Sequence, residues 1–79
     1  MEIKFKFIGP LKFEVGGRSI FSRDVPEGST VEDALRVAGM DCKNTASFNF
    51  AVVNGEKVEP DHVLSPDDEV KVFPRSFGG

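Results

Sequence analysis

The chain has 79 residues with a single cysteine, Cys42, and it contains no tryptophan or tyrosine. One cysteine excludes an internal disulfide framework and any cysteine-rich iron or zinc site within one chain. No apolar run approaches the roughly 18 residues of a membrane-spanning helix. The chain does not start with basic residues followed by an apolar block, so we expect no signal peptide. These absences predict a cytoplasmic protein that does not insert into a membrane.

Positive charge is also scarce, because 10 Lys and Arg residues face 13 Asp and Glu residues, which gives a net charge of −3 and a pI near 5.0. A nucleic-acid-binding domain is expected to show a basic face or stripe, and Lys4 and Lys6 alone do not supply one. We therefore predict no nucleic-acid partner. A mildly acidic surface is suited to docking on a basic partner, although acidity also serves solubility.

The sequence contains few candidate catalytic or metal-binding residues. His62 is the one histidine and has no partner at metal-ligand spacing, which favours a surface or half-buried position. The carboxylates of Asp67, Asp68 and Glu69 are consecutive, so they point apart and are typical of a solvated turn. Cys42 could be a nucleophile or persulfide acceptor, but no basic cluster beside it in sequence lowers its pKa. We predict no metal site, no bound cofactor and no catalysis by this chain alone.

Local patterns predict strands and one helix within a single domain, residues 1–79, with residues 75–79 as a tail. Alternation of charged and apolar residues and turn signals indicate strands at Glu2–Phe7, Arg18–Val25, Phe48–Val53, Glu56–Val58 and Glu69–Phe73. Asn54-Gly55 predicts a type I′ hairpin turn. Leu11–Val15 is compatible with either a helical turn or a strand.

A short helix is expected after Pro26-Glu27-Gly28, with Ser29 or Thr30 as its N-cap. Its buried stripe should consist of Val31, Ala34, Leu35 and Ala38, and Gly39 is a plausible C-terminal stop.

This order of elements predicts an α+β protein with the β-grasp (ubiquitin-like) fold, a mixed four- to five-stranded sheet with one main helix packed across it. The first and last strands should lie side by side at the centre of the sheet, so that a flexible tail leaves from the end of a central strand. Four phenylalanines are expected in the core: Phe5, Phe7, Phe48 and Phe50.

The C-terminal segment, Phe73-Pro74-Arg75-Ser76-Phe77-Gly78-Gly79, allows two interpretations. It could be a frayed end, as many termini are. It could instead present a reactive carboxylate, because Gly78 and Gly79 lack Cβ atoms and can pass through a channel as narrow as a main chain. The carboxylate could then attack the α-phosphate of ATP held by a partner. Phe77 favours insertion of the tail into a partner's groove, with folding back onto its own domain as the alternative.

Four motifs resemble those of the MoaD/ThiS family of ubiquitin-like sulfur carriers. They are the helix approach Pro26–Val31, the hairpin Val53–Glu56, the block His62, Leu64, Asp68-Glu69-Val70 with Phe73-Pro74, and the final Gly78-Gly79; Phe7, Leu11 and Gly16 match its first loop. Pro66-Asp67 departs from the family's usual Asp-Gly, although Pro66 suits the second position of the turn. The helix is also shorter than expected for the family.

The resemblance implies that Gly79 is adenylated by a ubiquitin-activating-enzyme-like adenylyltransferase, which binds the Mg-ATP, and is then converted to a thiocarboxylate. In the molybdopterin branch the sulfur is donated within a complex with the large synthase subunit, and in the thiamine branch another acceptor enzyme builds the thiazole. The segment between Gly9 and Arg18, together with Phe73-Pro74, favours the molybdopterin branch.

We therefore predict Gly79 as the reactive residue. The tail and partner-binding residues are expected to be Gly78, Phe77, Ser76, Arg75, Pro74 and Phe73. Two rival hypotheses are a ubiquitin-like modifier joined to proteins through Gly79 and an interaction domain with an inert tail.

Overall fold

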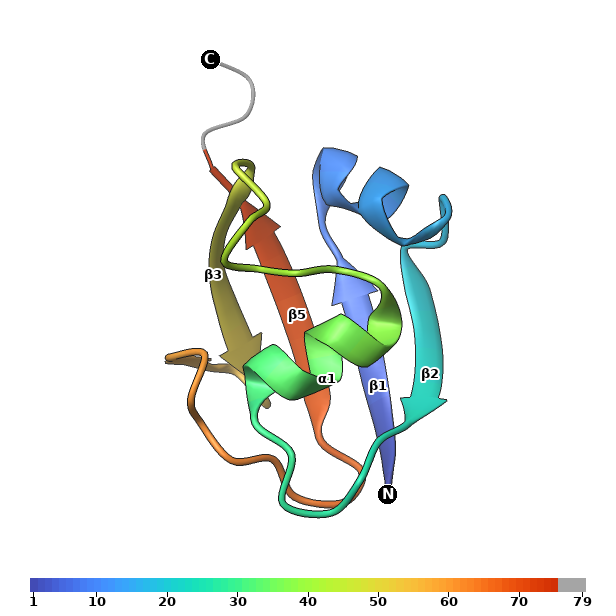
Figure 1. The fold of residues 1–79 in the computed structure, drawn as a ribbon, viewed down its shortest axis with the longest axis vertical. Helices are drawn as coiled ribbons and strands as arrows, with labels where there is room; N and C mark the ends of the chain where they lie inside the picture. The colour runs from blue at the N-terminus through green and yellow to red at the C-terminus, as the bar shows by residue number, and fades with distance from the viewer. Residues whose placement is uncertain (76–79) are drawn as a thin grey trace.

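Five strands form one mixed sheet with a single α-helix across one face (Figure 1), in a computed structural model that describes residues 1–75. In chain order the elements are β1 (Glu2–Phe7), the 3₁₀ helix η1 (Gly9–Val15), β2 (Ile20–Asp24), α1 (Val31–Ala38), β3 (Phe48–Val53), β4 (Glu56–Val58) and β5 (Glu69–Pro74). The predicted strands are all present, β2 being shorter than expected and β5 one residue longer. For Leu11–Val15 the sequence allowed either a helical turn or a strand. The segment lies in η1, with Leu11 fully buried.

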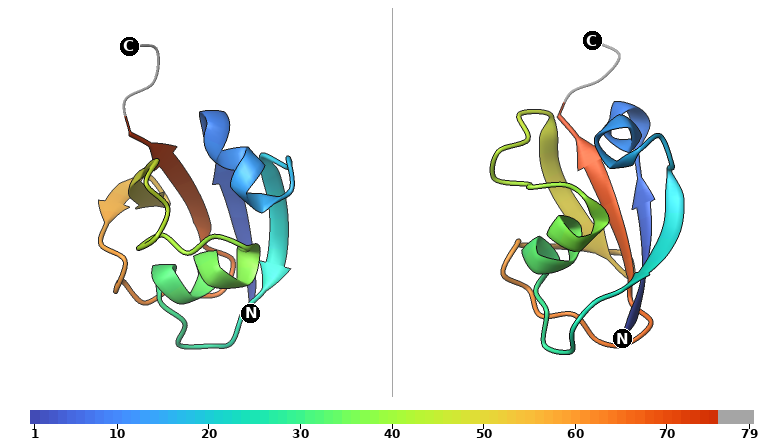
Figure 2. Two further views of the ribbon diagram at one scale, coloured as in Figure 1. Left: turned by 45° about the horizontal axis from the view of Figure 1, so that its top comes forward. Right: turned by 45° about the vertical axis from the view of Figure 1, so that its right-hand side comes forward.

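The strand order is β2-β1-β5-β3-β4, with β1 and β5 parallel and the other neighbouring pairs antiparallel. The prediction that the first and last strands lie side by side at the centre is therefore confirmed. Both views in Figure 2 show α1 on one face of this sheet. The other face, which we call the open face, carries no helix among the described residues.

The core lies between α1 and the sheet. The predicted helix stripe is confirmed, since Val31, Ala34, Leu35 and Ala38 are the buried residues of α1. They pack against alternate residues of the two central strands, which are Ile3, Phe5, Phe7, Val70 and Val72. Such alternation buries one face of each strand and leaves the intervening residues for the open face.

A capping box begins α1 at Thr30. The Thr30 hydroxyl accepts a hydrogen bond from the Asp33 amide at 3.2 Å, and the Asp33 carboxylate accepts one from the Thr30 amide at 3.1 Å. The hydrogen bond from the Thr30 backbone amide is the main cause that holds the pKa of the Asp33 carboxyl below its usual value of 3.8. Ser29 is not the cap, because its hydroxyl donates to the Pro26 carbonyl at 2.6 Å. Gly39 ends the helix with φ of +111°, a left-handed conformation that glycine adopts easily.

The expected core position of Phe50 is wrong. The pairing of β3 with β5 shifts between Phe48 and Phe50, so that Phe48 lies opposite Pro74 and Phe50 opposite Phe73. Two residues of β3 therefore advance against one of β5, which is a bulge. The bulge keeps Phe48 against the core with Ala51 and Val53, while Phe50 turns to the open face and stacks on Phe73.

The expectation of a fully solvated Asp67–Glu69 turn is wrong for Asp68. The residue is 9% exposed, and its carboxylate accepts hydrogen bonds from the Ser65 amide and from the Asn54 side-chain amide, each at 2.8 Å. The Asn54 side-chain oxygen accepts from the Glu69 amide at 3.0 Å. These bonds connect the β3–β4 hairpin to the start of β5. The predicted turn at Asn54-Gly55 is present, with φ of +49° and +88°.

Candidate functional site

β5 carries the chain to the predicted site from the centre of the sheet. It is paired on both sides, with β1 and with β3, and its C-terminal end lies at the same end of the sheet as η1 (Figure 1). The pairing continues past the strand, because the Arg75 amide donates a hydrogen bond to the Ser47 carbonyl at 2.7 Å. The backbone is therefore held as far as Arg75.

Phe73 and Pro74, predicted as tail residues, belong to β5 and face opposite sides of the sheet. Pro74 is buried, beyond Val72 on the core side. Phe73 is half-buried on the open face and stacks on Phe50, with ring centroids 4.9 Å apart and planes inclined by 14°. The Lys57 ammonium lies 5.0 Å from the centroid of the Phe50 ring. Phe50 and Phe73 thus form a partly exposed aromatic pair directly before the tail.

The remaining predicted residues, Ser76, Phe77, Gly78 and Gly79, lie outside the described residues. Their placement and their roles stay predictions. Covalent geometry bounds their reach, because four extended residues beyond Arg75 span at most about 14 Å.

Cys42, considered above as a nucleophile or persulfide acceptor, is buried in the core at 6% exposure. Burial raises the pKa of its thiol, and the charges of Glu32 and Asp41 raise it further. A thiol with a raised pKa is a poor nucleophile at neutral pH. Within residues 1–75 the net effect is a raised pKa, so Cys42 is not activated there and acts as a small apolar side chain of the core.

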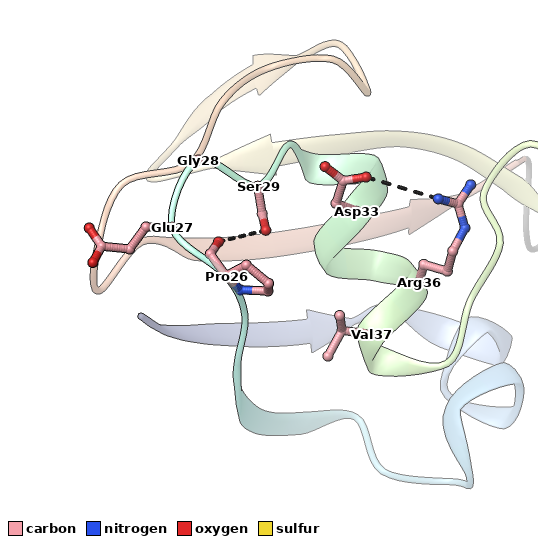
Figure 3. A pocket seen from close by; sticks show the side chains of 7 residues that line it. All are labelled: Pro26, Glu27, Gly28, Ser29, Asp33, Arg36 and Val37. Atoms are coloured by element: carbon pink, nitrogen blue, oxygen red, sulfur yellow. Dashed lines mark hydrogen bonds and ion pairs between the residues drawn. The ribbon is translucent and has the colours of Figure 1, made fainter.

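An open pocket of about 490 Å³ lies between α1 and the turn that precedes it (Figure 3). It is lined by Pro26, Glu27, Gly28, Ser29, Asp33, Arg36 and Val37. Two polar pairs are drawn there: Ser29 donates to the Pro26 carbonyl, and Arg36 lies 3.9 Å from Asp33, whereas the Glu27 carboxylate points away from both pairs. These pairings explain the local fold and leave no convergent set of groups for a ligand.

Residues 1–75 hold no cluster of three or more His, Cys, Asp or Glu side chains that could bind a metal ion. His62 is exposed, and its carbonyl accepts a hydrogen bond from the Val31 amide at 2.9 Å. Within the same part of the chain no helix has the length and apolar character needed to cross a membrane.

Sequence reasoning missed two features of this end of the molecule. The Arg75 amide donates to the backbone carbonyl of Ser47. Every residue type has such a carbonyl, so the sequence could not predict this hydrogen bond. The Phe50–Phe73 pair depends on the bulge in β3, which changes the face that Phe50 occupies. A bulge of this kind follows from strand pairing and was not visible in the alternation of the segment alone.

The mixed sheet with parallel central strands, the helix across one face and the chain end leaving from β5 define the ubiquitin-like β-grasp class. Within that class the chain belongs to the ThiS family, whose family model matches residues 9–79. It is thus a ubiquitin-like sulfur carrier of the ThiS/MoaD kind, as the motifs indicated. A search of curated protein sequences found no match for the chain.

Solved structures of similar fold cover nearly the whole chain. SAMP1 from Haloferax volcanii is 24% identical with a TM-score of 0.77, and the match covers 100% of both chains. Putative molybdopterin converting factor subunit 1 from Pyrococcus furiosus is 24% identical with a TM-score of 0.73, covering 94% of this chain and 97% of the other. A chain of the complex of molybdopterin-converting factor subunits 1 and 2 from Helicobacter pylori is 15% identical with a TM-score of 0.65, covering 100% of both. At these identities the likeness establishes the fold.

Proposed function

We propose that this carrier supplies sulfur for molybdopterin synthesis through a thiocarboxylate on Gly79. An oxygen of the Gly79 carboxylate attacks the α-phosphorus of ATP bound with Mg²⁺ on an adenylyltransferase, and pyrophosphate leaves. Hydrosulfide, the sulfur donor, then attacks the carbonyl carbon of the acyl-adenylate, and the bond from that carbon to the phosphate oxygen breaks to release AMP. The resulting thiocarboxylate donates its sulfur to a pterin precursor within a complex with the large synthase subunit.

The observation that carries this proposal is the position of β5. It lies at the centre of the sheet and is held up to Arg75, while the family match continues to Gly79. A fixed origin limits where the last four residues can reach, which helps to bring one carboxylate to a partner's nucleotide. Gly78 and Gly79 suit a narrow channel because they lack side chains, and we propose Phe77, Ser76 and Arg75 as further tail residues that bind the partner.

The molybdopterin branch is supported by the similarity in fold to molybdopterin-converting factor subunits from two organisms. One of those chains was solved in a complex of subunits 1 and 2. The partly exposed Phe50–Phe73 pair beside the tail agrees with a carrier that docks on a large subunit. Delivery of sulfur to thiamine thiazole uses the same thiocarboxylate and differs in the acceptor enzyme.

The test is adenylation of Gly79 by the source organism's ubiquitin-activating-enzyme-like adenylyltransferase with Mg-ATP. Pyrophosphate release should require the unmodified end, so that a variant extended by one residue after Gly79, and a variant lacking Gly79, should fold normally and lose the reaction. Circular dichroism is the control for folding. Adenylation of the extended variant at the normal rate would refute the assignment of Gly79.

A second experiment follows the sulfur. Protein purified from its source cells should be heavier than the encoded chain by the difference between one sulfur and one oxygen atom, and incubation with the large synthase subunit and pterin precursor should remove that mass. Loss of the sulfur only to the thiazole-forming enzyme would place the carrier in the thiamine branch.

A ubiquitin-like modifier is the second candidate, favoured by the similarity in fold to SAMP1. A modifier shares the adenylation step, but the activated Gly79 carbonyl is then attacked by a lysine amine of a target protein, which forms an isopeptide bond. A ladder of conjugates on a gel, lost when Gly79 is removed, would support this candidate.

A further inference from the structure

Lysine side chains cross the open face of the sheet in one row. The strand register places Lys6 of β1 directly opposite Lys71 of β5, Lys71 opposite Val52 of β3, and Val52 opposite Lys57 of β4. Residues directly opposite one another point to the same face of a sheet. Lys6 and Lys71 alternate with the buried Phe5, Phe7, Val70 and Val72, so this face is the one opposite α1. We call Lys6, Lys71 and Lys57 the lysine row.

The lysine row has no carboxylate partner among the described residues. The ion pairs of the described residues all lie on α1 and the connection after it. They involve Glu32, Asp33, Arg36 and Lys43. On β5 the carboxylate residue nearest to Lys71 on the open face is Glu69, two register positions further from the tail, where it lies opposite Lys4. Like charges directly opposite one another destabilise a sheet, so the Lys6–Lys71 pair costs the isolated fold some stability.

The lysine row adjoins the aromatic pair and the tail. Phe73 follows Lys71 by two residues on the same face, a spacing of about 7 Å along a strand. Lys57 belongs to the lysine row and also contacts the aromatic pair, because its ammonium lies over the Phe50 ring. Along β5 towards the tail, the residues on the open face are therefore Glu69, then Lys71, then Phe73.

We infer that the lysine row docks on a carboxylate-bearing surface of the adenylyltransferase that receives the tail. This inference rests on the proposed function and adds the charge of the partner. The complementary surface has an apolar pocket for Phe73 and Phe50 at the mouth of the tail channel and acidic side chains beyond it. Those carboxylates remove the repulsion between Lys6 and Lys71, so the unfavourable pair of the free carrier becomes favourable on docking.

The net charge of the whole molecule favours one docking orientation over the others. The net charge is −3, so a partner with an acidic surface repels the carrier in most orientations and attracts it through the lysine row. Electrostatics then orients the carrier with its tail towards the channel. Nucleic acid is disfavoured by the net charge and by the stacking of Phe50 on Phe73, which occupies one face of each ring.

The test compares rates of adenylation by the source organism's adenylyltransferase with Mg-ATP. At low salt, Lys71→Gln should lower kcat/KM about threefold and the Lys6→Gln/Lys71→Gln double variant about tenfold. The kcat at saturating carrier should not change, because the tail is intact. About 0.5 M salt should abolish the differences. Lys43→Gln removes the same charge on the helix side and is the matched control, expected to react at the wild-type rate.

The outcomes separate this inference from the proposed function. A wild-type chain that is not adenylated overturns both. If the wild type is adenylated and the double variant reacts equally well, or if Lys43→Gln loses as much activity as Lys71→Gln, the docking role of the lysine row is overturned while Gly79 keeps its assignment.

Two further measurements could assign the face to another occupant and would also overturn the inference. One is a dimer in sedimentation that the double variant abolishes, and the other is binding of single-stranded RNA that the double variant abolishes.

Discussion

The carboxylate of Asp68 should be a main contributor to the stability of the sheet, although it lies next to a turn. It accepts hydrogen bonds from the Ser65 amide and the Asn54 side chain, each at 2.8 Å, and the residue is 9% exposed. Hydrogen bonds to a charged group contribute about 1.5–3 kcal/mol each, and a buried donor left without a partner is costly. We expect Asp68→Ala to lower the free energy of unfolding by about 2–4 kcal/mol.

The assay is urea unfolding followed by circular dichroism, with thermal unfolding as a second measure. For a domain of this size a loss of that magnitude corresponds to a fall in Tm of roughly 10–20 °C. Asp68→Asn is the matched control: it keeps the shape and an acceptor oxygen but not the charge, and should lose about half as much. The folded fraction of Asp68→Ala should still be adenylated on Gly79, because the tail is unchanged.

A double-mutant cycle isolates the contact with Asn54. Asn54→Gly is the suitable second variant, because glycine accepts the positive φ of +49° at this position. The coupling free energy between the two side chains should be about 1–2 kcal/mol. A loss below about 0.5 kcal/mol for Asp68→Ala, or a coupling near zero, would refute the reasoning.

Two other predictions concern groups whose pKa is shifted. The folded-state pKa of Asp33 lies below 3.8, so its stabilising contribution is present above that pH and lost as the pH falls through the folded value. Thr30→Ala should cost about 1 kcal/mol, because it removes the hydroxyl that accepts from the Asp33 amide. Asp33→Asn should lower the free energy of unfolding at neutral pH and lower it less near pH 2, and an equal loss at both pH values would contradict a role for the Asp33 carboxylate in the capping box. The buried thiol of Cys42, with its raised pKa, should react with iodoacetamide at least about tenfold more slowly at pH 8 in the folded protein than in urea. Equal rates would show that the thiol is accessible.

The features that sequence predicted well are those set by neighbouring residues. Asn54-Gly55 specifies its turn because both residues accept positive φ, and Thr30 lies three residues from the carboxylate that completes its capping box. The alternation in Glu2–Phe7 matches the burial of β1 residue by residue. The central position of β5 followed from the order of the elements, which few folds can accommodate.

The features that sequence missed depend on pairing between distant segments. Asp68 is buried because Asn54, 14 residues away, lies against it in the folded chain. Phe50 lies on the open face and not in the predicted core position, because β3 forms a bulge against β5. Net charge suggested a basic docking partner, yet a sum over the chain cannot show that Lys6 and Lys71 meet on one face. For the candidate site, the tail remains a prediction from sequence because its last four residues lie outside the described residues, whereas the surface beside it required the register.

β5 joins the two halves of the sheet, since β1 and β2 lie on one side of it and β3 and β4 on the other. Neither half is connected to the other through strand pairing until β5 enters between them, which makes its insertion a long-range and therefore late step of folding. The same strand leads directly to the last glycines. Under the function and docking proposed above, an activating enzyme that engages both the open face and the tail would select molecules that have finished folding.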